Sequence, residues 1–432
     1  MSNVAVIGAG YVGITTAACL AHLGHDVRCA DVDAERVQRL RKGDIPILEE
    51  RLPVLVSEGL ETRRLQFVVG AAEAVVGANV VFLCVNTPTS DTGAADLRYL
   101  DAAAAEIAPL LEPDAVVVTK STAPVGTSRR IQQILDEHGG AAKGIRVASN
   151  PEFLREGSAV RDFLKPDRIV VGCDDPSVAV TITDLYRGIH APVVVTDPAS
   201  AELIKYASNA YLATRVSFVN AIANLSEAVG ADIRDVALGM GYDSRIGSHY
   251  LDPGPGFGGS CLPKDVKALL HTAQESGHDL PPLRATLEVN AAQRTAVVAK
   301  IAAALGDRPL ADSQIAMWGL TFKANTDDLR DSPALEIAAS LLEAGAHVRA
   351  YDPVAGEQAA RLMPDVDVVF DPYDACEGAD VMALLTEWEE FRWADFGRVK
   401  AAMRGHEIVD TRNALDASRM RQLGFSYRGV GR

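Results

Sequence analysis

The run Gly8-Ala9-Gly10-Tyr11-Val12-Gly13 constrains the fold more than any other feature of this 432-residue chain. It follows an apolar run, Val4–Gly8, and opens a stretch with helical spacing, Val12–Leu23. Glycines at these positions permit a tight turn, close approach of a pyrophosphate and close helix–strand packing. The start of the helix adds free N–H groups and the positive end of a dipole. The pattern therefore predicts the first βα unit of a dinucleotide-binding domain, with an ordinary strand–helix turn as the alternative.

An acidic residue at the end of the second expected strand indicates which dinucleotide binds. Asp31 follows Gly13 by about 18 residues, the spacing of this fingerprint. A carboxylate there accepts hydrogen bonds from the adenosine ribose and repels a 2′-phosphate, so we expect NAD rather than NADP. Arg36 complicates this preference, unless its side chain lies along the ribose or adenine.

Apolar runs alternate with amphipathic stretches in both ends of the chain, which predicts mainly parallel, doubly wound sheets. In the first half the expected strands are Val4–Gly8, Val27–Asp31, Val80–Val85, Ala115–Lys120, Arg146–Ser149 and Ile169–Gly172, with helices that include Val12–Leu23 and Leu100–Leu111. From about Ser313 the expected strands are Gln314–Leu320, His347–Asp352, Asp367–Phe370, Asp380–Leu385 and Glu407–Asp410.

Two long Ala-rich stretches with helical spacing, Ala201–Val229 and Leu283–Leu305, separate these regions. Helices of this length usually bury a stripe against a partner, so we expect a connecting and dimerising spine. The expected fold class is α/β, with two Rossmann-like doubly wound domains joined by a long-helix central domain. The expected divisions are an NAD-binding domain at 1–197, a central domain at 198–305 and a nucleotide-sugar-binding domain at 306–432.

Composition excludes several classes of function. The net charge of −16 argues against nucleic acid, because phosphate binding needs clustered Lys and Arg. No apolar run is long enough to cross a bilayer, and the N-terminus lacks a basic region ahead of an apolar one. The six cysteines form no CxxC pair, which suggests reduced thiols in a cytoplasmic protein and no metal site. They are Cys19, Cys29, Cys84, Cys173, Cys261 and Cys376.

One cysteine has chemically suggestive neighbours. Cys261 follows Phe257-Gly258-Gly259-Ser260 and precedes Leu262-Pro263-Lys264-Asp265. Glycines let backbone approach a ligand, and a nearby cation favours the thiolate over the thiol. A buried structural cysteine is the commoner alternative. Asp265 has its own alternative, as the N-cap of a helix at Val266–Leu270.

Hydroxyl side chains follow two expected strands, at the edge of a doubly wound sheet where ligands bind. Thr87 and Thr89 follow the strand that ends at Val85, and Ser121 and Thr122 follow another. These residues are candidates for contact with the cofactor or a catalytic water, and helix capping is the alternative.

Taken together, these pieces resemble the UDP-glucose/GDP-mannose dehydrogenase family nearly from end to end. Many motifs carry the resemblance: the glycine fingerprint, Lys120-Ser121-Thr122, residues 150–157 (NPEFLREG), 202–210 (ELIKYASNA), the cysteine loop, 319–323 (GLTFK), 326–333 (TDDLRDSP), 410–413 (DTRN) and the ending 427–432 (YRGVGR).

The resemblance implies a four-electron oxidation of a nucleotide sugar at carbon 6, with NAD as the cofactor. Cys261 would attack the aldehyde to form a thiohemiacetal, and a second hydride transfer would leave a thioester that water cleaves. The remaining catalytic residues implied are Lys205 and Asn209 for oxyanion charge, Asp265 and Thr122 for the catalytic water, and Glu152 as a general base. On sequence alone, Lys205 and Asn209 would be a surface lysine and a helix-interior asparagine.

The resemblance also implies two binding sets. The cofactor-binding set is Gly8, Gly10, Tyr11, Val12, Gly13, Asp31, Arg36, Val85, Thr87, Ser121, Thr122, Glu156 and Arg330. The substrate-binding set is Glu152, Phe153, Leu154, Arg155, Lys205, Asn209, Arg245, Tyr250, Phe257, Gly258, Cys261, Lys323 and Arg412. Arg245 matches a residue contributed by a neighbouring subunit, so a homodimer or higher homo-oligomer is expected.

Two segments point to different sugars. Residues 243–251 (DSRIGSHYL) resemble the UDP-glucose branch, whereas Leu262 and the run 261–266 (CLPKDV) lean toward GDP-mannose enzymes. We expect UDP-glucose, with GDP-mannose as the alternative and the N-acetylmannosamine branch third. A single-step hydroxyacid-type dehydrogenase and a non-catalytic nucleotide-sugar-binding protein are the rivals outside this reaction; neither needs Cys261.

Overall fold

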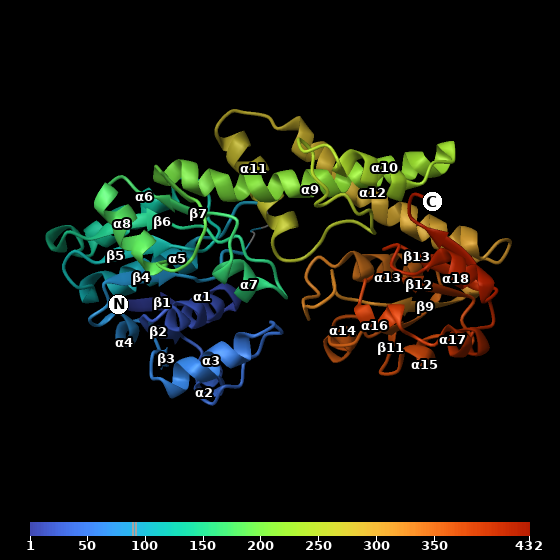
Figure 1. Ribbon diagram of the computed structural model, residues 1–432, viewed down its shortest axis with the longest axis horizontal. Coiled ribbons are helices and arrows are strands. Elements are labelled where there is room, and N and C mark those ends of the chain that lie inside the picture. Colours follow the sequence, from blue (N-terminus) through green and yellow to red (C-terminus); the bar gives the residue numbers. More distant parts are fainter. Residues whose placement is uncertain (89, 91–92) are drawn as a thin grey trace. The chain divides into compact units, whose positions relative to one another are not determined.

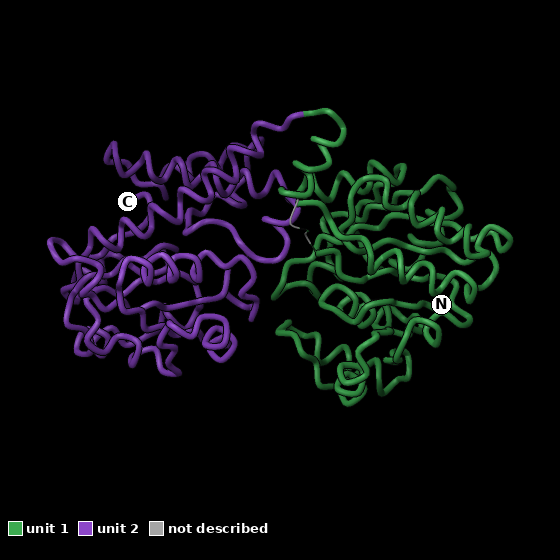
Figure 2. The backbone as a smooth tube through the Cα atoms, turned by 180° about the vertical axis from the view of Figure 1, so that it is seen from behind, with its two compact units in different colours: residues 1–208, 267–278 green, residues 209–266, 279–432 purple. Residues whose placement is uncertain are grey.

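The computed structural model describes residues 1–88, 90 and 93–432, so Thr89 lies outside the described residues. The described chain divides into two compact units (Figure 2). Unit 1 comprises residues 1–208 and 267–278, and unit 2 comprises residues 209–266 and 279–432. Each unit contains one parallel or mainly parallel sheet (Figure 1).

The sheet of unit 1 has the order β3-β2-β1-β4-β5-β6-β7-β8, and only β6 and β7 pair antiparallel. Its strands are β1 (Asn3–Ile7), β2 (Asp26–Asp31), β3 (Leu65–Val69), β4 (Val80–Leu83), β5 (Val116–Thr119), β6 (Arg146–Ser149), β7 (Ile169–Gly172) and β8 (Val193–Thr196). The helices around it are α1 (Tyr11–His22), α2 (Ala34–Arg41), α3 (Leu52–Glu61), α4 (Ala71–Val75), α5 (Arg98–Ile107), α6 (Thr127–Glu137), α7 (Ala159–Leu164) and α8 (Pro176–Leu185), with 3-10 turns η1 (Ala108–Leu110) and η2 (Ala141–Lys143).

The sheet of unit 2 repeats the first part of this order, as β11-β10-β9-β12-β13-β14, with all neighbours parallel. Its strands are β9 (Gln314–Trp318), β10 (His347–Tyr351), β11 (Asp367–Val369), β12 (Val381–Leu384), β13 (Glu407–Asp410) and β14 (Ser426–Gly429). Its helices are α13 (Pro333–Glu343), α14 (Gly356–Leu362), α15 (Pro372–Ala375), α16 (Glu389–Arg392), α17 (Phe396–Ala402) and α18 (Ala417–Gln422), and the 3-10 turn η3 (Leu310–Asp312) precedes β9.

Along the chain, the segment between β8 and β9 forms α9 (Pro198–Val229), α10 (Ile233–Gly241), α11 (Leu262–Glu275) and α12 (Pro281–Ala304). The long helices expected at Ala201–Val229 and Leu283–Leu305 are therefore confirmed within three residues at each end. The unit boundary passes through α9 after Ser208 and through α11 after Val266. The first turns of α11, with Cys261 just before them, belong to unit 2.

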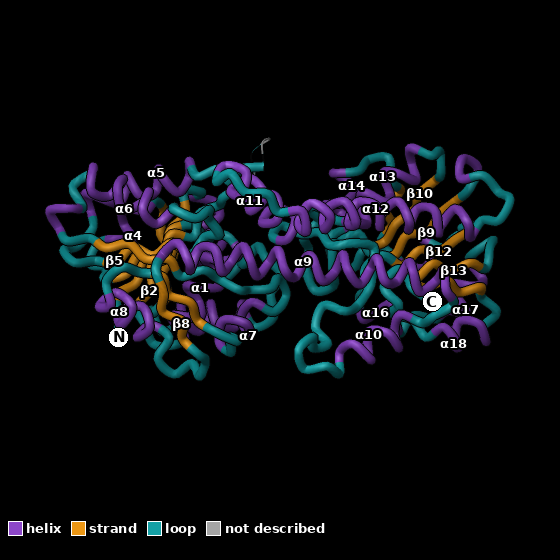
Figure 3. Tube along the Cα trace, turned by 90° about the horizontal axis from the view of Figure 1, so that it is seen from above, coloured by secondary structure: helices purple, strands orange, loops and turns teal. Residues whose placement is uncertain are grey.

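Both faces of each sheet are buried, which explains why the strands are apolar runs without polar alternation. Val4 and Val6 of β1 join one core cluster, which includes residues of α1 and α3. Ala5 and Ile7 point to the opposite face and join a second cluster, with residues of α4, α5 and α6. Figure 3 shows helices on both faces of the strands in each unit. The α/β class with two Rossmann-like sheets is confirmed.

The strands expected from the sequence are all present, but three edge strands were not expected. They are β3 and β8 at the two edges of the first sheet and β14 at one edge of the second. Polar residues interrupt the apolar runs of β3 and β14. β8 is different, because it contains three consecutive valines although it is mostly exposed, so its sequence carried an apolar signal that was missed. The divisions at 197 and 305 remain predictions. In the part of the chain that is described, no helix is both long enough and apolar enough to span a bilayer.

Candidate functional site

The glycine turn after β1 is packed as the sequence predicts. Gly8 has φ of +101°, a conformation that side chains other than glycine rarely adopt, and its N–H donates to Ala30 O at 2.8 Å. A Cβ on Gly13 would lie 1.8 Å from Gly8 O, so α1 can approach β1 this closely only through glycine. Gly10 begins α1 without a side-chain cap, which leaves the first N–H groups of the helix to an anion.

Asp31 lies at the end of β2 and is bonded to this turn. Its Oδ2 accepts from Ala9 N at 2.9 Å, its Oδ1 accepts from Asp33 N at 3.0 Å, and Arg36 lies 3.5 Å from Oδ2. The uncapped helix start and a carboxylate at the end of the second strand fit the pyrophosphate and ribose of NAD. Arg36 therefore pairs with Asp31 in this structure.

Tyr11 of the fingerprint joins the glycine turn to the segment that contains Glu156. Its hydroxyl donates to the buried carboxylate of Glu49 and accepts from Gly157 N at 2.9 Å. Burial, reinforced by Glu49, raises the pKa of Tyr11. Val12, the next residue, packs on the core of unit 1. No motif pointed to Glu49, which lies 38 residues beyond Tyr11.

The hydroxyl residues after β4 and β5 bond to one another's backbone. Ser121 Oγ donates to Val85 O at 2.6 Å, and Thr87 Oγ1 donates to Thr122 O at 2.7 Å. The nearest following helix, α6, starts at Gly126 and Thr127, so Ser121 and Thr122 do not cap it. The capping alternative is wrong for Ser121 and Thr122, because the chain runs several residues past β5 before it becomes helical.

A buried ion pair joins the NPEFLREG segment to α9. Lys205 Nζ lies 2.9 Å from Glu152 Oε1, and only 4% and 6% of the two side chains are exposed. Lys205 is therefore not a surface lysine. The Phe153 ring lies beside the pair, with its centroid 5.5 Å from Lys205 Nζ and 3.4 Å from the Arg168 guanidinium carbon.

The charge state of Glu152 follows from its neighbours. Burial alone would raise the pKa of Glu152, but Lys205, the Leu154 N–H at 2.5 Å and Lys120 hold that pKa below its usual value. Glu152 is therefore ionised near neutral pH. Arg155, in the same segment, forms a two-bond fork with Asp162, at 3.0 and 2.6 Å.

Lys120 is a second buried cation in unit 1 that sequence reasoning did not assign. Its ammonium donates to Asn150 Oδ1 at 3.0 Å and to Tyr186 Oη at 3.3 Å. Tyr186 in turn donates to Asn150 Oδ1 at 2.5 Å. This network fixes Asn150, two residues before Glu152. Only the Lys-Ser-Thr motif pointed to this position.

In unit 2, Cys261 immediately precedes α11. The first bond of the helix runs from Asp265 N to Cys261 O at 2.9 Å, so the half-buried thiol lies at the positive end of the helix. That position favours the thiolate. The alternative of Asp265 as an N-cap is wrong, because the helix starts four residues earlier than expected, at Leu262, and Asp265 lies in its first turn.

Asp265 is fully buried and holds two partners. Its Oδ2 accepts from Asn209 Nδ2 at 2.6 Å, and its Oδ1 lies 2.9 Å from Lys264 Nζ. Asn209 is on α9, one helical turn after Lys205, as expected. The structure thus brings together Asn209, Lys264 and Asp265 within unit 2, and Glu152, Phe153 and Lys205 within unit 1.

The loop before Cys261 is packed against the segment that precedes α13. Gly259 N donates to Arg330 O at 3.0 Å, and a Cβ on Gly258 would lie 2.1 Å from Asp331 O. Phe257 is buried, and both of its backbone groups bond to the side chain of Asn290 on α12. The sequence offered no signal for Asn290, because it lies 33 residues from Phe257.

Two of the expected cations of unit 2 contact nearby backbone or aromatic groups. Arg412 donates to Leu385 O at 2.9 Å and to Phe322 O at 2.8 Å, and its Nε also forms an ion pair of 3.0 Å with Glu387 Oε2. Lys323 Nζ lies 5.5 Å from the centroid of the Phe322 ring.

The other two expected cations of unit 2 form short-range ion pairs. Arg330 forms a fork with Asp328, with a closest contact of 2.7 Å. Arg245, whose side chain is 88% exposed, forms a similar fork with Asp243. Tyr250, in the segment after Arg245, has φ of +60°.

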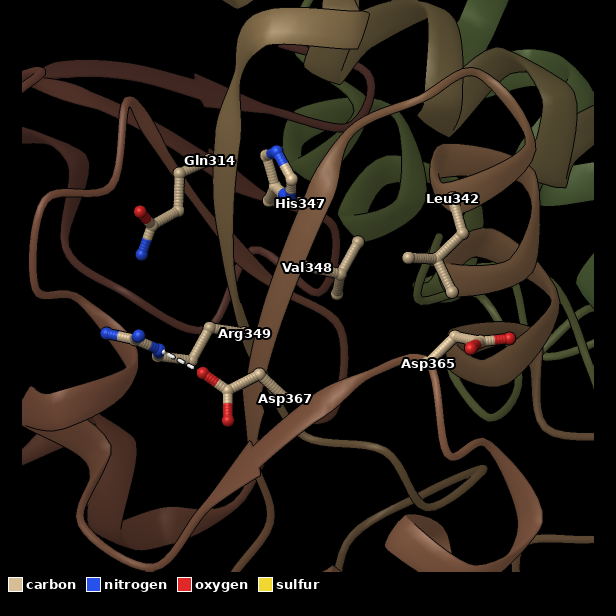
Figure 4. A pocket seen from close by; sticks show the side chains of 7 residues that line it. All are labelled: Gln314, Leu342, His347, Val348, Arg349, Asp365 and Asp367. Atoms are coloured by element: carbon tan, nitrogen blue, oxygen red, sulfur yellow. Dashed lines mark hydrogen bonds and ion pairs between the residues drawn. The ribbon is translucent and has the colours of Figure 1, made fainter.

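A pocket in unit 2 lies away from these residues. It is lined by the first residues of β9, β10 and β11, which are Gln314, His347 and Asp367 (Figure 4). An ion pair of 2.6 Å between Arg349 and Asp367 crosses one side of it. Ligands of doubly wound sheets bind at the opposite, carboxyl ends of the strands, so we assign this pocket no role in the site.

Comparisons with known proteins agree with the fold and the motifs. Models of the UDP-glucose/GDP-mannose dehydrogenase family match its NAD binding domain at residues 2–190, its central domain at 199–292 and its UDP binding domain at 316–417. The UDP-glucose 6-dehydrogenase of Rhizobium meliloti is 46% identical, with 100% of this chain and 99% of the relative covered. That of Pseudomonas aeruginosa is 43% identical, with 99% and 97% covered.

A solved structure extends the agreement to three dimensions. The UDP-glucose dehydrogenase of Pyrobaculum islandicum superposes with a TM-score of 0.92 at 38% identity, covering 100% of this chain and 98% of the other. The family models supply the NAD-binding domain, and the curated relatives and the solved structure are dehydrogenases of UDP-glucose. The chain belongs to the UDP-glucose/GDP-mannose dehydrogenase family, and is an NAD-dependent nucleotide-sugar dehydrogenase.

Proposed function

We propose that this protein oxidises UDP-glucose to UDP-glucuronate, using two NAD and one water for each sugar. The names of its relatives support the substrate. The observation that supports the four-electron course is the position of Cys261, a half-buried thiol at the start of α11. A single-step alcohol oxidation has no use for a nucleophile there.

The glycine turn and Asp31 would hold NAD, and a separate NAD molecule would accept the hydride from carbon 6 in each of the two oxidations. The first oxidation releases one proton and gives the aldehyde. The Cys261 thiolate then adds to the aldehyde carbon, and the carbonyl oxygen takes a proton to give the thiohemiacetal. Loss of that proton and a second hydride leaves the thioester, and water cleaves the carbon–sulfur bond to release the acid and regenerate the thiolate.

The surrounding residues supply charge and proton acceptors for these steps. Lys205 and Asn209 would stabilise negative charge on the reacting oxygen, as a cation and an amide donor. Glu152, held ionised by Lys205, is the proposed base for thioester hydrolysis. Asp265 and Thr122 would orient the attacking water. Asp265 is buried and bonded to Asn209, which fixes the direction of its carboxylate.

Binding roles follow the same division. The proposed cofactor contacts are the glycine turn with Asp31, together with Ser121, Thr122 and Glu156. The proposed contacts to the nucleotide sugar are Phe257 and Gly258 in the cysteine loop and Lys323 and Arg412 in the UDP binding domain. Positive charge at Lys323 suits a diphosphate.

We further propose that the protein acts as a homodimer formed through α9. Large apolar side chains are exposed at intervals of seven residues on this helix, at Tyr211, Phe218 and Leu225. That spacing keeps them on one helical face, which a second copy would cover. Light scattering should give twice the mass of one chain, and Phe218→Glu should shift the protein toward monomer.

The test of function is the yield of NADH from a limiting amount of nucleotide sugar. About two NADH per UDP-glucose, and none from GDP-mannose, are expected. About one would mean that the aldehyde is released and that the proposed role of Cys261 is wrong. Two with GDP-mannose and none with UDP-glucose would keep the mechanism and change the substrate.

Cys261→Ala separates binding from chemistry. The variant should bind NAD and UDP-glucose with unchanged affinity but form no acid, because no thioester can form. Normal acid formation by Cys261→Ala would overturn the covalent route. Wild-type turnover of NAD to NADH by Cys261→Ala would instead favour a single-step dehydrogenase.

A further inference from the structure

Asn290 on α12 forms a reciprocal pair of hydrogen bonds with the cysteine loop. Phe257 N donates to Asn290 Oδ1 at 2.8 Å, and Asn290 Nδ2 donates to Phe257 O at 3.0 Å. One side chain therefore satisfies both backbone groups of one residue, as a neighbouring strand would in a sheet. Both residues are buried, so water does not replace either bond.

Further polar side chains on the long helices hold the start of the same loop. Asn220 Oδ1 accepts from Gly254 N at 2.8 Å, and Gln293 Nε2 donates to Gly254 O at 2.9 Å. Arg294 donates to Phe257 O at 3.1 Å, so that carbonyl has two donors. Asn220 and Gln293 are buried like Asn290.

The pairing is also tight in space. Gly256 has φ of +116°, and a Cβ there would lie 2.8 Å from Asn290 Oδ1. On the other side of the loop, a Cβ on Gly259 would lie 2.7 Å from the Phe322 ring. The loop therefore has one position between α12 and the second sheet domain, and Cys261 follows two residues later.

A buried amide is costly unless its bonds are made, and an apolar side chain could fill the same space. A side chain that hydrogen-bonds to both backbone groups of Phe257 also holds that backbone in one position. Apolar packing would not select a single position. We propose that Asn290 is a positioning residue for the reaction: through Phe257 it sets where the Cys261 thiol lies. This inference rests on the proposed role of Cys261 as the nucleophile.

Loss of Asn290 should lower kcat without lowering the rate at which Cys261 is alkylated. Iodoacetamide needs no positioned thiol, whereas attack on a bound aldehyde does, and a misplacement of about 1 Å can cost on the order of 100-fold. In Asn290→Leu, kcat should fall at least about tenfold, while the alkylation rate of Cys261 stays within about threefold of the wild type or rises. The KM for NAD should not change.

The chain provides its own control for unfolding. Peptide mapping after alkylation reports all six thiols, of which Cys19, Cys29, Cys84 and Cys376 are buried. These four should stay unlabelled in a folded variant. If they become labelled in Asn290→Leu, the test passes to Asn290→Asp, whose carboxylate still accepts from Phe257 N but cannot donate to Phe257 O. That variant should show the same separation between turnover and alkylation.

Thr286→Val is a matched control, because Thr286 lies one turn earlier on α12 and its hydroxyl bonds to Pro282 O at 2.9 Å and to Thr214 Oγ1 at 3.0 Å rather than to the loop. It should retain wild-type kcat. Unchanged kcat in Asn290→Leu with the buried thiols protected would refute the proposal. So would a parallel fall in kcat and in Cys261 alkylation, because Asn290 would then act on the thiol's reactivity. The NADH yield of the wild type tests the proposed function separately.

Discussion

Replacing Lys205 by methionine tests the buried ion pair of unit 1. The wild-type pair is 2.9 Å long with both side chains almost fully buried. Removing one partner leaves the Glu152 carboxylate buried with the Leu154 N–H as its remaining direct bond. Breaking buried pairs in this way costs about 3–5 kcal/mol of unfolding free energy. We expect a loss of that size for Lys205→Met at pH 7.

The cost should depend on pH, with a sign that follows from proton binding. In the wild type the folded-state pKa of Glu152 is lowered, so its contribution to stability is present above the unfolded pKa and is lost as pH falls through the folded pKa. In Lys205→Met burial remains without the lysine, so the folded-state pKa rises above the unfolded one. The folded variant then binds a proton that the unfolded chain releases, and its stability falls as pH rises. The difference between wild type and variant should therefore grow from pH 5 to pH 7.5.

Urea titrations with two probes measure this effect. Circular dichroism reports both units, whereas tryptophan fluorescence reports unit 2 alone, because Trp318, Trp388 and Trp393 are the only tryptophans. The loss should appear in circular dichroism and be small in fluorescence.

The double variant Lys205→Met/Glu152→Gln should recover much of the loss, since no buried charge remains. Arg187→Met, which removes an exposed pair with Asp184, is the control and should change little. A loss below about 1 kcal/mol at pH 7, or an equal loss at pH 5 and pH 7.5, would refute the reasoning.

Two further predictions concern unit 1. Gly13→Ala places a Cβ 1.8 Å from Gly8 O, so the glycine turn cannot close. Affinity for NAD, measured by calorimetric titration, should fall at least tenfold, roughly 1.4 kcal/mol. Normal NAD binding would contradict the fit of the cofactor at this turn. Burial lowers the pKa of His25, whose Nε2 lies 3.0 Å from Leu185 O and whose Nδ1 accepts from Ser2 N. Its contribution to stability should be complete above pH about 6.5 and be lost as pH falls through the lower folded-state pKa. The urea midpoint should therefore drop less between pH 7.5 and pH 5.5 in His25→Gln than in the wild type, and an equal drop would show that His25 does not titrate on unfolding.

The sequence by itself determined the fold class and identified Cys261 as a candidate nucleophile. The glycine turn, Asp31 and the alternating apolar runs predicted the α/β class, because a parallel sheet buried on both faces needs continuous apolar strands. The long helices also followed from composition. Cys261 stood out because its neighbours in sequence, two glycines and a lysine, are local. The edge strands β3 and β14 were not expected, because polar residues interrupt their apolar runs, whereas β8 was missed although it contains three consecutive valines.

Only the tertiary structure decided which distant side chains meet. The Glu152–Lys205 pair joins residues 53 positions apart (205 − 152), and it turned an apparent surface lysine into a buried one. The bonds from Asn290 to Phe257 span 33 positions, and the start of α11 moved Asp265 from an expected cap into the first turn. Periodicity reports which face of an element is buried, but it does not report what covers that face. The partners of a buried polar group are chosen by packing between elements, and that choice appears only when the chain is folded.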